Sequence, residues 1–339
     1  MSDEREPPRA LAVVGPTATG KTSLAAEVAR RLDGEIISVD SRQAYRGMEV
    51  GTAAPPAELR QEIPHHGVAF LSPGQRYGAG RFARRAREWI REIRGRGRVP
   101  ILAGGTGFFL KALTDPVFEE PEMDDERRGE LRAWMDERPD DLLLRWARRL
   151  DPALAERMDP LDPQRASRTL ELALLSGRPL SWWHDHGEPE APPLGARIYV
   201  LELATGPHRE RIERRTRQLL AKGWTEEVRA LRQAGHGPDS PALDALGYRD
   251  VARLLDGEID REEAVERIAR DTWQYARSQR TWFRHQVPED HTVRLDAAEP
   301  VEQLADRIVN DWERHAGGAS PGAGRREPEA SEEGGAAAG

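Results

Sequence analysis

The first 115 residues alternate between short apolar runs and longer segments in which apolar residues recur every three or four positions. The short runs have the length of buried strands, at residues 11–14, 35–39 and 99–103. The segments with helical spacing follow them, at residues 22–32, 81–94 and 108–113. Strands that alternate with helices in this way are typical of a parallel sheet covered by helices.

The pattern changes near Asp115. From there to about Gly195 the chain carries helical spacing and Pro-rich turns without a convincing strand. A strand is predicted again at residues 197–203, followed by helices at 207–221, 225–234, 244–255 and 261–285. We therefore predict an α/β fold with a core of residues 1–115 and 196–315, and a helical insertion at 116–195. The tail, 316–339, is low in apolar residues and is predicted to be disordered.

Composition narrows the chemistry. The chain has 339 residues, no Cys and a formal net charge of −8, so disulfides, thiolate nucleophiles and Cys-ligated zinc are excluded. Apolar runs are short and the N-terminus is charged, from which we expect no membrane span and a cytoplasmic protein. The acidic balance argues weakly against nucleic acid, but residues 81–98 contain eight Arg and two Glu. Local clusters of this kind can still bind phosphates.

The strongest local signal is GPTATGKT, which lies between the first predicted strand and the first predicted helix. It matches the phosphate-loop pattern G-x-x-x-x-G-K-[ST] in full. In such a loop, backbone N–H groups and a helix N-terminus face phosphate oxygens, the Lys adds a charge and the Thr hydroxyl can bind Mg²⁺. The predicted diphosphate site comprises Gly15, Pro16, Thr17, Ala18, Thr19, Gly20, Lys21 and Thr22, with Thr22 as metal ligand. The alternative is a Gly-rich turn with an incidental Lys.

The motif leaves the ligand open, because ATP or another diphosphate would suit it. A kinase would usually show an apolar strand that ends in an acid for Mg²⁺, and EIISVD ends in Asp40. However, the stretch after Asp40, SRQAYRGMEVGTA, does not belong to nucleoside monophosphate kinases.

Six motifs together resemble the tRNA dimethylallyltransferases, also called tRNA isopentenyltransferases. In family order they are GPTATGKTSLA, DSRQAYRGMEVGTAAP, PHHGV, PILAGGTGFFLKAL, DPQRASRTLE and QRTWFR, and the resemblance spans about residues 11–285. It implies a P-loop NTPase-like core with a helical domain for the anticodon arm of tRNA. It also implies transfer of the dimethylallyl group of dimethylallyl diphosphate to the exocyclic amine of the adenine 3′ of the anticodon, assisted by Mg²⁺. We expect a monomer.

The resemblance also assigns residues. Asp40 is the expected base, Thr106 lies near the reacting amine, and Lys21 and Arg211 hold the diphosphate. The expected tRNA contacts are Asp40, Ser41, Arg42, Gln43, Thr106, Arg128, Gln164, Arg165, Ala166, Ser167 and Arg168. Simpler roles remain open: a position behind Mg²⁺ for Asp40, a capping Thr for Thr106, and a solvated helix face for Arg211.

Two features separate this chain from the family pattern. In the helix that the family writes T-R-Q-x-A-K-R-Q, Trp273 and Ser278 replace basic residues. Either Arg277 and Arg280 serve instead, or RNA affinity is reduced. The zinc finger of eukaryotic relatives is absent, which fits a bacterial-type enzyme.

Three rival functions remain open: an adenylate isopentenyltransferase, a small-molecule kinase, and an RNA-binding protein without catalysis. The length of the insertion favours tRNA over a free nucleotide as acceptor. A kinase must bind ATP. The intact Lys21, Thr22 and Asp40 argue against loss of catalysis.

Overall fold

A computed structural model describes residues 9–116, 118–157, 161–237, 240 and 243–316. It divides into two compact units, one of residues 1–78, 84–107 and 195–339 and the other of residues 79–83 and 108–194. The expected insertion boundary at residue 116 thus falls inside the second unit. Residues 317–339 of the tail predicted to be disordered lie outside the described residues.

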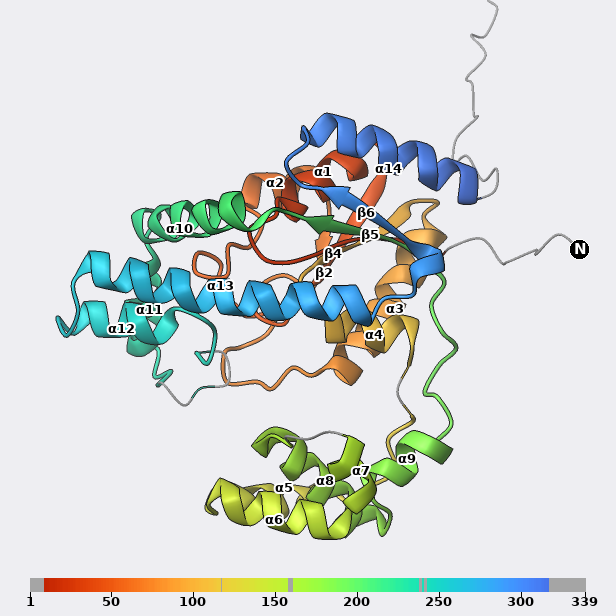
Figure 1. The fold of residues 1–339 in the computed structure, drawn as a ribbon, viewed down its shortest axis with the longest axis vertical. Helices are drawn as coiled ribbons and strands as arrows, with labels where there is room; N and C mark the ends of the chain where they lie inside the picture. The colour runs from red at the N-terminus through yellow and green to blue at the C-terminus, as the bar shows by residue number, and fades with distance from the viewer. Residues whose placement is uncertain (1–8, 117, 158–160, 238–239, 241–242, 317–339) are drawn as a thin grey trace, which may run out of the picture. The chain divides into compact units, whose positions relative to one another are not determined.

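The first unit is built on a six-stranded sheet in which every pairing is parallel, in the order β3-β2-β4-β1-β5-β6. Figure 1 labels β2, β4, β5 and β6 of this sheet. The strands are β1 (Ala10–Val14), β2 (Gly34–Val39), β3 (His65–His66), β4 (Val99–Gly104), β5 (Ala196–Glu202) and β6 (Thr292–Asp296). In a parallel sheet all the carboxyl ends lie at one edge, where ligands usually bind. β1, β2 and β4, which end in the phosphate loop, Asp40 and the GGTG segment, are neighbours there.

Helices surround this sheet. Their bounds are α1 (Lys21–Leu32), α2 (Ala57–Glu62), α3 (Ala79–Gly95), α10 (Thr205–Ala221), α11 (Trp224–Gln233), α12 (Tyr248–Leu255), α13 (Arg261–His285), the 3₁₀ turn η1 (Glu289–His291) and α14 (Val301–His315). Among the described residues, no helix is both long and apolar enough to cross a membrane.

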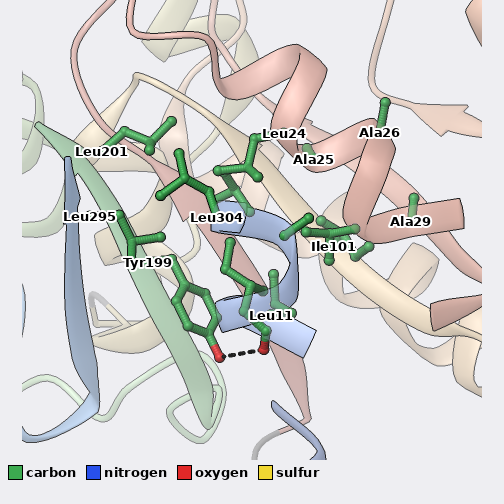
Figure 2. Close-up of a cluster of buried hydrophobic side chains, with 14 of the residues drawn as sticks. Leu11, Leu24, Ala25, Ala26, Ala29, Ile101, Tyr199, Leu201, Leu295 and Leu304 are labelled. Atoms are coloured by element: carbon green, nitrogen blue, oxygen red, sulfur yellow. Dashed lines mark hydrogen bonds between the residues drawn. The ribbon is translucent and has the colours of Figure 1, made fainter. Parts of the chain in front are cut away.

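One buried cluster fastens α1 and α14 to the sheet, as Figure 2 shows. Leu24, Ala25 and Ala29 of α1 and Leu304 of α14 pack with side chains from the strands β1, β4 and β5. Tyr199 in this cluster donates a hydrogen bond from its hydroxyl to Asp311 at 3.0 Å. Burial of this apolar surface holds α1, and with it the phosphate loop, against the end of β1.

The second unit is helical. It comprises α4 (Gly107–Thr114, from its second residue), α5 (Asp125–Asp136), α6 (Asp140–Leu150), α7 (Pro152–Arg157), α8 (Pro163–Ser176) and α9 (Leu180–His186). Its buried cluster joins α5, α6, α7 and α8 through residues such as Leu143, Ala147 and Leu170. Asp162 caps α8 by accepting a hydrogen bond from the Arg165 amide at 2.8 Å, and Pro163 follows, as the DPQR motif predicts.

The predicted α/β class and parallel sheet are confirmed. In the first unit the prediction missed the short helix α2, the two-residue strand β3, the 3₁₀ turn η1, the edge strand β6 and the last helix α14.

Candidate active site

The phosphate loop connects β1 to α1 through backbone that glycine makes possible. Gly15 has a φ of 143°, and a Cβ there would lie 2.6 Å from the carbonyl oxygen of Leu201. Gly20 has a φ of 93° directly before α1 begins at Lys21. The loop therefore has the tight, strand-to-helix course that turns backbone N–H groups toward an anion.

The loop forms one wall of a cavity of about 650 Å³ in the first unit. The opposite walls come from the segment after β2, the GTAAP segment at 51–55, the end of β4, and the helices α10 and α13. The side chains with polar chemistry are Thr17, Lys21, Thr22, Ser38, Asp40, Gln43, Glu49, Arg60, His65, Arg215, Lys222, Tyr275 and Gln279. This volume is of the size that small-molecule sites have in proteins.

Thr17 is held from three directions. Its N–H donates to Gln279 Oε1 at 2.9 Å, and its hydroxyl accepts from Arg215 Nη1 at 3.1 Å. Its carbonyl lies 2.8 Å from Nε2 of the buried His208, whose Nδ1 lies 3.1 Å from Arg280 Nη2. Because Arg280 can only donate, Nδ1 accepts and Nε2 carries the proton that reaches Thr17. The loop is thus fixed by α10 and α13 before any ligand binds.

Lys21 is the cation at the centre of the loop. Its Nζ donates to the Pro16 carbonyl at 2.6 Å. Burial, together with the nearby charge of Arg215, lowers the pKa of Lys21 to about 7, although Asp40 opposes the shift. A half-buried ammonium group whose pKa is depressed by desolvation in this way is poised to gain from an anionic ligand.

The helix α10 brings Arg215 to the loop. Burial lowers the pKa of Arg215, with Asp40 acting in the opposite direction, and the side chain lines the cavity. Arg211, which the resemblance assigns to the diphosphate, lies one turn earlier. Its Nη2 donates to the Ala297 carbonyl at 3.1 Å, and it does not line the cavity. Sequence reasoning missed Arg215, although the motif HRERIERR contains both arginines.

Asp40 follows β2 and lines the cavity. Its Oδ1 accepts from the Arg42 amide at 2.8 Å and from the Gln43 amide at 3.3 Å, which makes a local turn. Within the described residues, Oδ2 carries no hydrogen bond. Asp40 thereby contributes a carboxylate to the cavity wall, with Oδ1 held by the turn.

Thr106 lies beside this turn. Its hydroxyl accepts from the Ser41 amide at 3.1 Å, and its own amide donates to the Val39 carbonyl at 3.1 Å. The flanking glycines permit close packing: a Cβ on Gly104 would lie 2.1 Å from the Val39 carbonyl oxygen, and one on Gly107 would lie 2.2 Å from the Trp282 ring. Thr106 therefore joins the ends of β2 and β4 next to Asp40.

The remaining residues of the DSRQ motif point to different partners. Gln43 lines the cavity, accepts from the Ser38 hydroxyl at 2.9 Å and reaches the Ala53 carbonyl at 3.4 Å. Arg42 lies 3.7 Å from Asp244 as an ion pair. The motif thus contributes Asp40 and Gln43 to the cavity wall, whereas Arg42 pairs with Asp244.

The expected tRNA-contacting residues of the second unit separate into three groups. Gln164 and Arg165 are exposed at the start of α8, where Arg165 Nε lies 3.4 Å from Asp162. Ala166 is buried and Ser167 is half-buried. Arg128 and Arg168 bind the carboxylates of Glu171 and Glu120.

The two replacements in α13 have different consequences. Trp273 lies under two guanidinium groups, with Arg209 4.8 Å and Arg280 5.6 Å from the ring centroid. Such cation–π contacts place positive charge where the family carries a basic side chain. The hydroxyl of Ser278 donates to the carbonyl of Gln274, one turn earlier in the same helix, at 3.2 Å.

This fold and site define a phosphate-loop α/β protein with a carboxylate in the same cavity as the loop. A family profile described as IPP transferase matches residues 43–286, and one described as isopentenyl transferase matches residues 8–63. The chain belongs to the IPP transferase family.

Named relatives agree with this placement. The tRNA dimethylallyltransferase of Halorhodospira halophila is 41% identical, with 88% of this chain and 96% of the relative covered. That of Carboxydothermus hydrogenoformans is 34% identical, with 89% and 96% covered. The crystal structure of the tRNA isopentenylpyrophosphate transferase of Bacillus halodurans is 30% identical, covers 90% of this chain and 97% of its own, and has a TM-score of 0.63. The sequence resemblance and the expected fold are confirmed.

Proposed function

We propose that this protein transfers the dimethylallyl group of dimethylallyl diphosphate to the exocyclic amine of the adenine 3′ of the anticodon in tRNA. The products are N6-dimethylallyladenosine and diphosphate. The observation that carries the proposal is the convergence of Lys21, Arg215 and Asp40 on one cavity behind a complete phosphate loop. Relatives named tRNA dimethylallyltransferase support the choice of substrates.

The phosphate loop would hold the leaving group. Transfer breaks the bond between the allylic carbon and the diphosphate oxygen, so negative charge grows on the diphosphate. Lys21 and Arg215 are fixed and partly desolvated before the reaction, which makes their interaction with that charge strong. Because His208 and Gln279 hold Thr17, the backbone donors of the loop need little rearrangement when the diphosphate arrives.

Asp40 would take the proton of the amine. The adenine amine is a weak nucleophile whose lone pair is delocalised into the ring, and alkylation makes it acidic. Asp40 lines the cavity that Lys21 also lines, and within the described residues its Oδ2 carries no hydrogen bond. A carboxylate in this position serves as general base, while Thr106 holds the neighbouring backbone in place.

The residues present also fit Mg²⁺. The cavity offers the Thr22 hydroxyl and the Asp40 carboxylate as oxygen ligands, and Mg²⁺ commonly uses one or two protein oxygens together with substrate phosphates and water. When bound, the metal would neutralise charge on the diphosphate. In the described residues, no group of three or more His, Asp or Glu forms an all-protein metal cage.

The second unit would bind the anticodon arm, with Gln164 and Arg165 at the exposed start of α8. A target base inside a loop must leave its stack before it can reach a carboxylate in the wall of a cavity. We propose further that the protein acts as a monomer in the cytoplasm.

Mass spectrometry of tRNA incubated with the protein, dimethylallyl diphosphate and Mg²⁺ tests the function. We expect one dimethylallyl group on the adenine 3′ of the anticodon. Modification of adenosine monophosphate with equal efficiency would instead identify an adenylate isopentenyltransferase. ATP-dependent phosphorylation without prenyl transfer would identify a kinase.

A further inference from the structure

Three arginines of the second unit surround one buried carboxylate. Glu171 of α8 has only 3% of its side chain exposed. Its Oε1 accepts from Arg128 Nε at 3.0 Å, Arg128 Nη2 at 2.7 Å and Arg168 Nη1 at 2.6 Å, and its Oε2 accepts from Arg132 Nε at 2.5 Å. Glu120 adds a second carboxylate, which binds Arg128 at 2.6 Å and Arg168 at 2.7 Å.

The charges of this cluster do not cancel. Three guanidinium groups against two carboxylates leave one positive charge. Burial opposes the ionised form of Glu171, but hydrogen bonds from Arg132 and Arg128 outweigh it and lower the pKa of this carboxyl. Glu171 therefore stays ionised at neutral pH and keeps its hydrogen bonds to the three arginines.

The arginines remain accessible on their outer side. The side chains of Arg132 and Arg168 are 41% and 34% exposed, whereas that of Glu171 is buried beneath them. A guanidinium group has five donors in a planar fork, so one bonded to a carboxylate can still donate to a phosphate. The carboxylate also removes the rotamer freedom that a long Arg side chain would otherwise lose on binding.

We propose that Glu171 is a positioning residue for tRNA, which holds Arg128, Arg132 and Arg168 as a fixed cationic cluster for a backbone phosphate. The inference rests on the proposed function. The carboxylate of Glu171 would then strengthen tRNA binding, although a negative charge near an RNA-binding surface ordinarily weakens it.

The direction in which tRNA affinity changes shows whether Glu171 positions the arginines or only repels RNA. Glu171→Gln removes one negative charge, and so does Glu130→Gln at an exposed position of α5. If Glu171 only opposes RNA, both variants should bind tRNA more tightly. If Glu171 positions the cluster, Glu171→Gln should bind roughly tenfold more weakly, because charge-assisted hydrogen bonds to phosphate are lost. Glu130→Gln should bind as tightly as the parent or slightly more so.

The experiment is titration of labelled tRNA with full-length parent, Glu171→Gln and Glu130→Gln over a range of salt concentrations. We expect Glu171→Gln to flatten the dependence of log affinity on log salt by about one phosphate contact. Affinity for dimethylallyl diphosphate, measured by calorimetry, should stay at the parent level in all three proteins. Glu171→Gln that binds tRNA as tightly as the parent would overturn the inference.

A second variant tests the inference in case Glu171→Gln fails to fold. Glu120 is 32% exposed and lies at the rim of the cluster, so Glu120→Gln should leave thermal unfolding close to the parent's. We expect it to weaken tRNA binding in the same direction and by a smaller factor, and tighter binding would contradict the inference. A parent protein that binds tRNA but fails to modify it would refute the proposed function and leave the cluster intact as a binding device.

Discussion

Two arginines show how differently the two units use positive charge. Arg215 in the first unit is half-buried, makes its hydrogen bond to the neutral Thr17 hydroxyl, and has a lowered pKa because desolvation outweighs the charge of Asp40. Arg128 in the second unit is also partly buried, but hydrogen bonds and charge from Glu171 and Glu120 outweigh burial and raise its pKa. Among the residues that the structure describes, Arg215 forms no ion pair, whereas Arg128 pairs with two carboxylates.

This difference indicates where each unit gains energy from a ligand. A desolvated cation without a carboxylate recovers much of its lost hydration energy when a diphosphate arrives, so the first unit suits tight binding of a small, highly charged group. Cations already paired gain less per contact but are held in a defined geometry, which suits a large ligand with many phosphates. Changes in the first unit should therefore affect donor and chemistry, and changes in the second should affect tRNA alone.

The largest expected effect is that of Asp40→Asn. The amide has the same shape but cannot take the proton, so the single-turnover rate should fall on the order of a hundred- to ten-thousand-fold while both substrates still bind. Rapid-quench kinetics measures the rate. A rate within a few-fold of the parent would show that Asp40 is not the base, and a collapse of Mg²⁺ affinity would favour the metal-ligand role instead.

Next in size is Lys21→Ala, which removes the ammonium group that faces the leaving diphosphate. The barrier should rise by roughly 3 kcal/mol or more, which abolishes practical turnover. Filter binding of tRNA should be nearly unchanged, because Lys21 lies in the phosphate loop and is not among the expected tRNA contacts. Near-normal turnover of this variant would contradict the assignment of the loop to the leaving group.

A smaller difference should separate two neighbouring arginines. Arg215→Ala should weaken binding of dimethylallyl diphosphate by about 2 kcal/mol, because one charge-assisted contact to phosphate is lost. Arg211→Ala should have a clearly smaller effect, since that side chain binds the Ala297 carbonyl. Calorimetry on both variants decides between them, and the reverse ranking would restore Arg211 as the residue that grips the diphosphate.

The pKa of Lys21 predicts a pH dependence for the donor. Binding of the diphosphate needs the ammonium form of Lys21, whose pKa is lowered to about 7. The affinity for dimethylallyl diphosphate should therefore be nearly constant below about pH 7. Above it, affinity should fall by up to about tenfold per pH unit, because binding must then take up a proton. Lys21→Arg, which stays protonated, should remove this fall in affinity. Calorimetry in several buffers would detect the proton uptake of the parent. A parent affinity that does not change with pH would contradict the prediction.

The smallest expected effect lies in the second unit. Arg165 is exposed at the start of α8, so Arg165→Ala should weaken tRNA binding by a few-fold and flatten the salt dependence by about 0.7 in log–log slope. Affinity for dimethylallyl diphosphate should be unchanged. An unaltered tRNA affinity and slope would remove the start of α8 from the anticodon-arm contact.

Local signals predicted much of this molecule. The apolar runs of β1, β2, β4 and β5 lie where the sequence places them, because buried parallel strands are short and continuously apolar. β3 and β6 escaped prediction for the opposite reason. The pair His65 and His66 and the run TVRLD are too short or too polar at the sheet edge to stand out, and their strand character comes from pairing with β2 and β5.

By itself the sequence determined the local course of the phosphate loop, the turn at Asp40 and the cap at Asp162, since each depends on bonds between residues a few positions apart, whereas the bonds that fix Thr17 come from α10 and α13. Only the tertiary structure decided between Arg211 and Arg215. The two lie four residues apart on one helix face, and their difference arises from what packs against α10: the Ala297 carbonyl beside one and Thr17 beside the other. Partners separated by such distances along the chain leave no periodic signal, because folding alone brings them together.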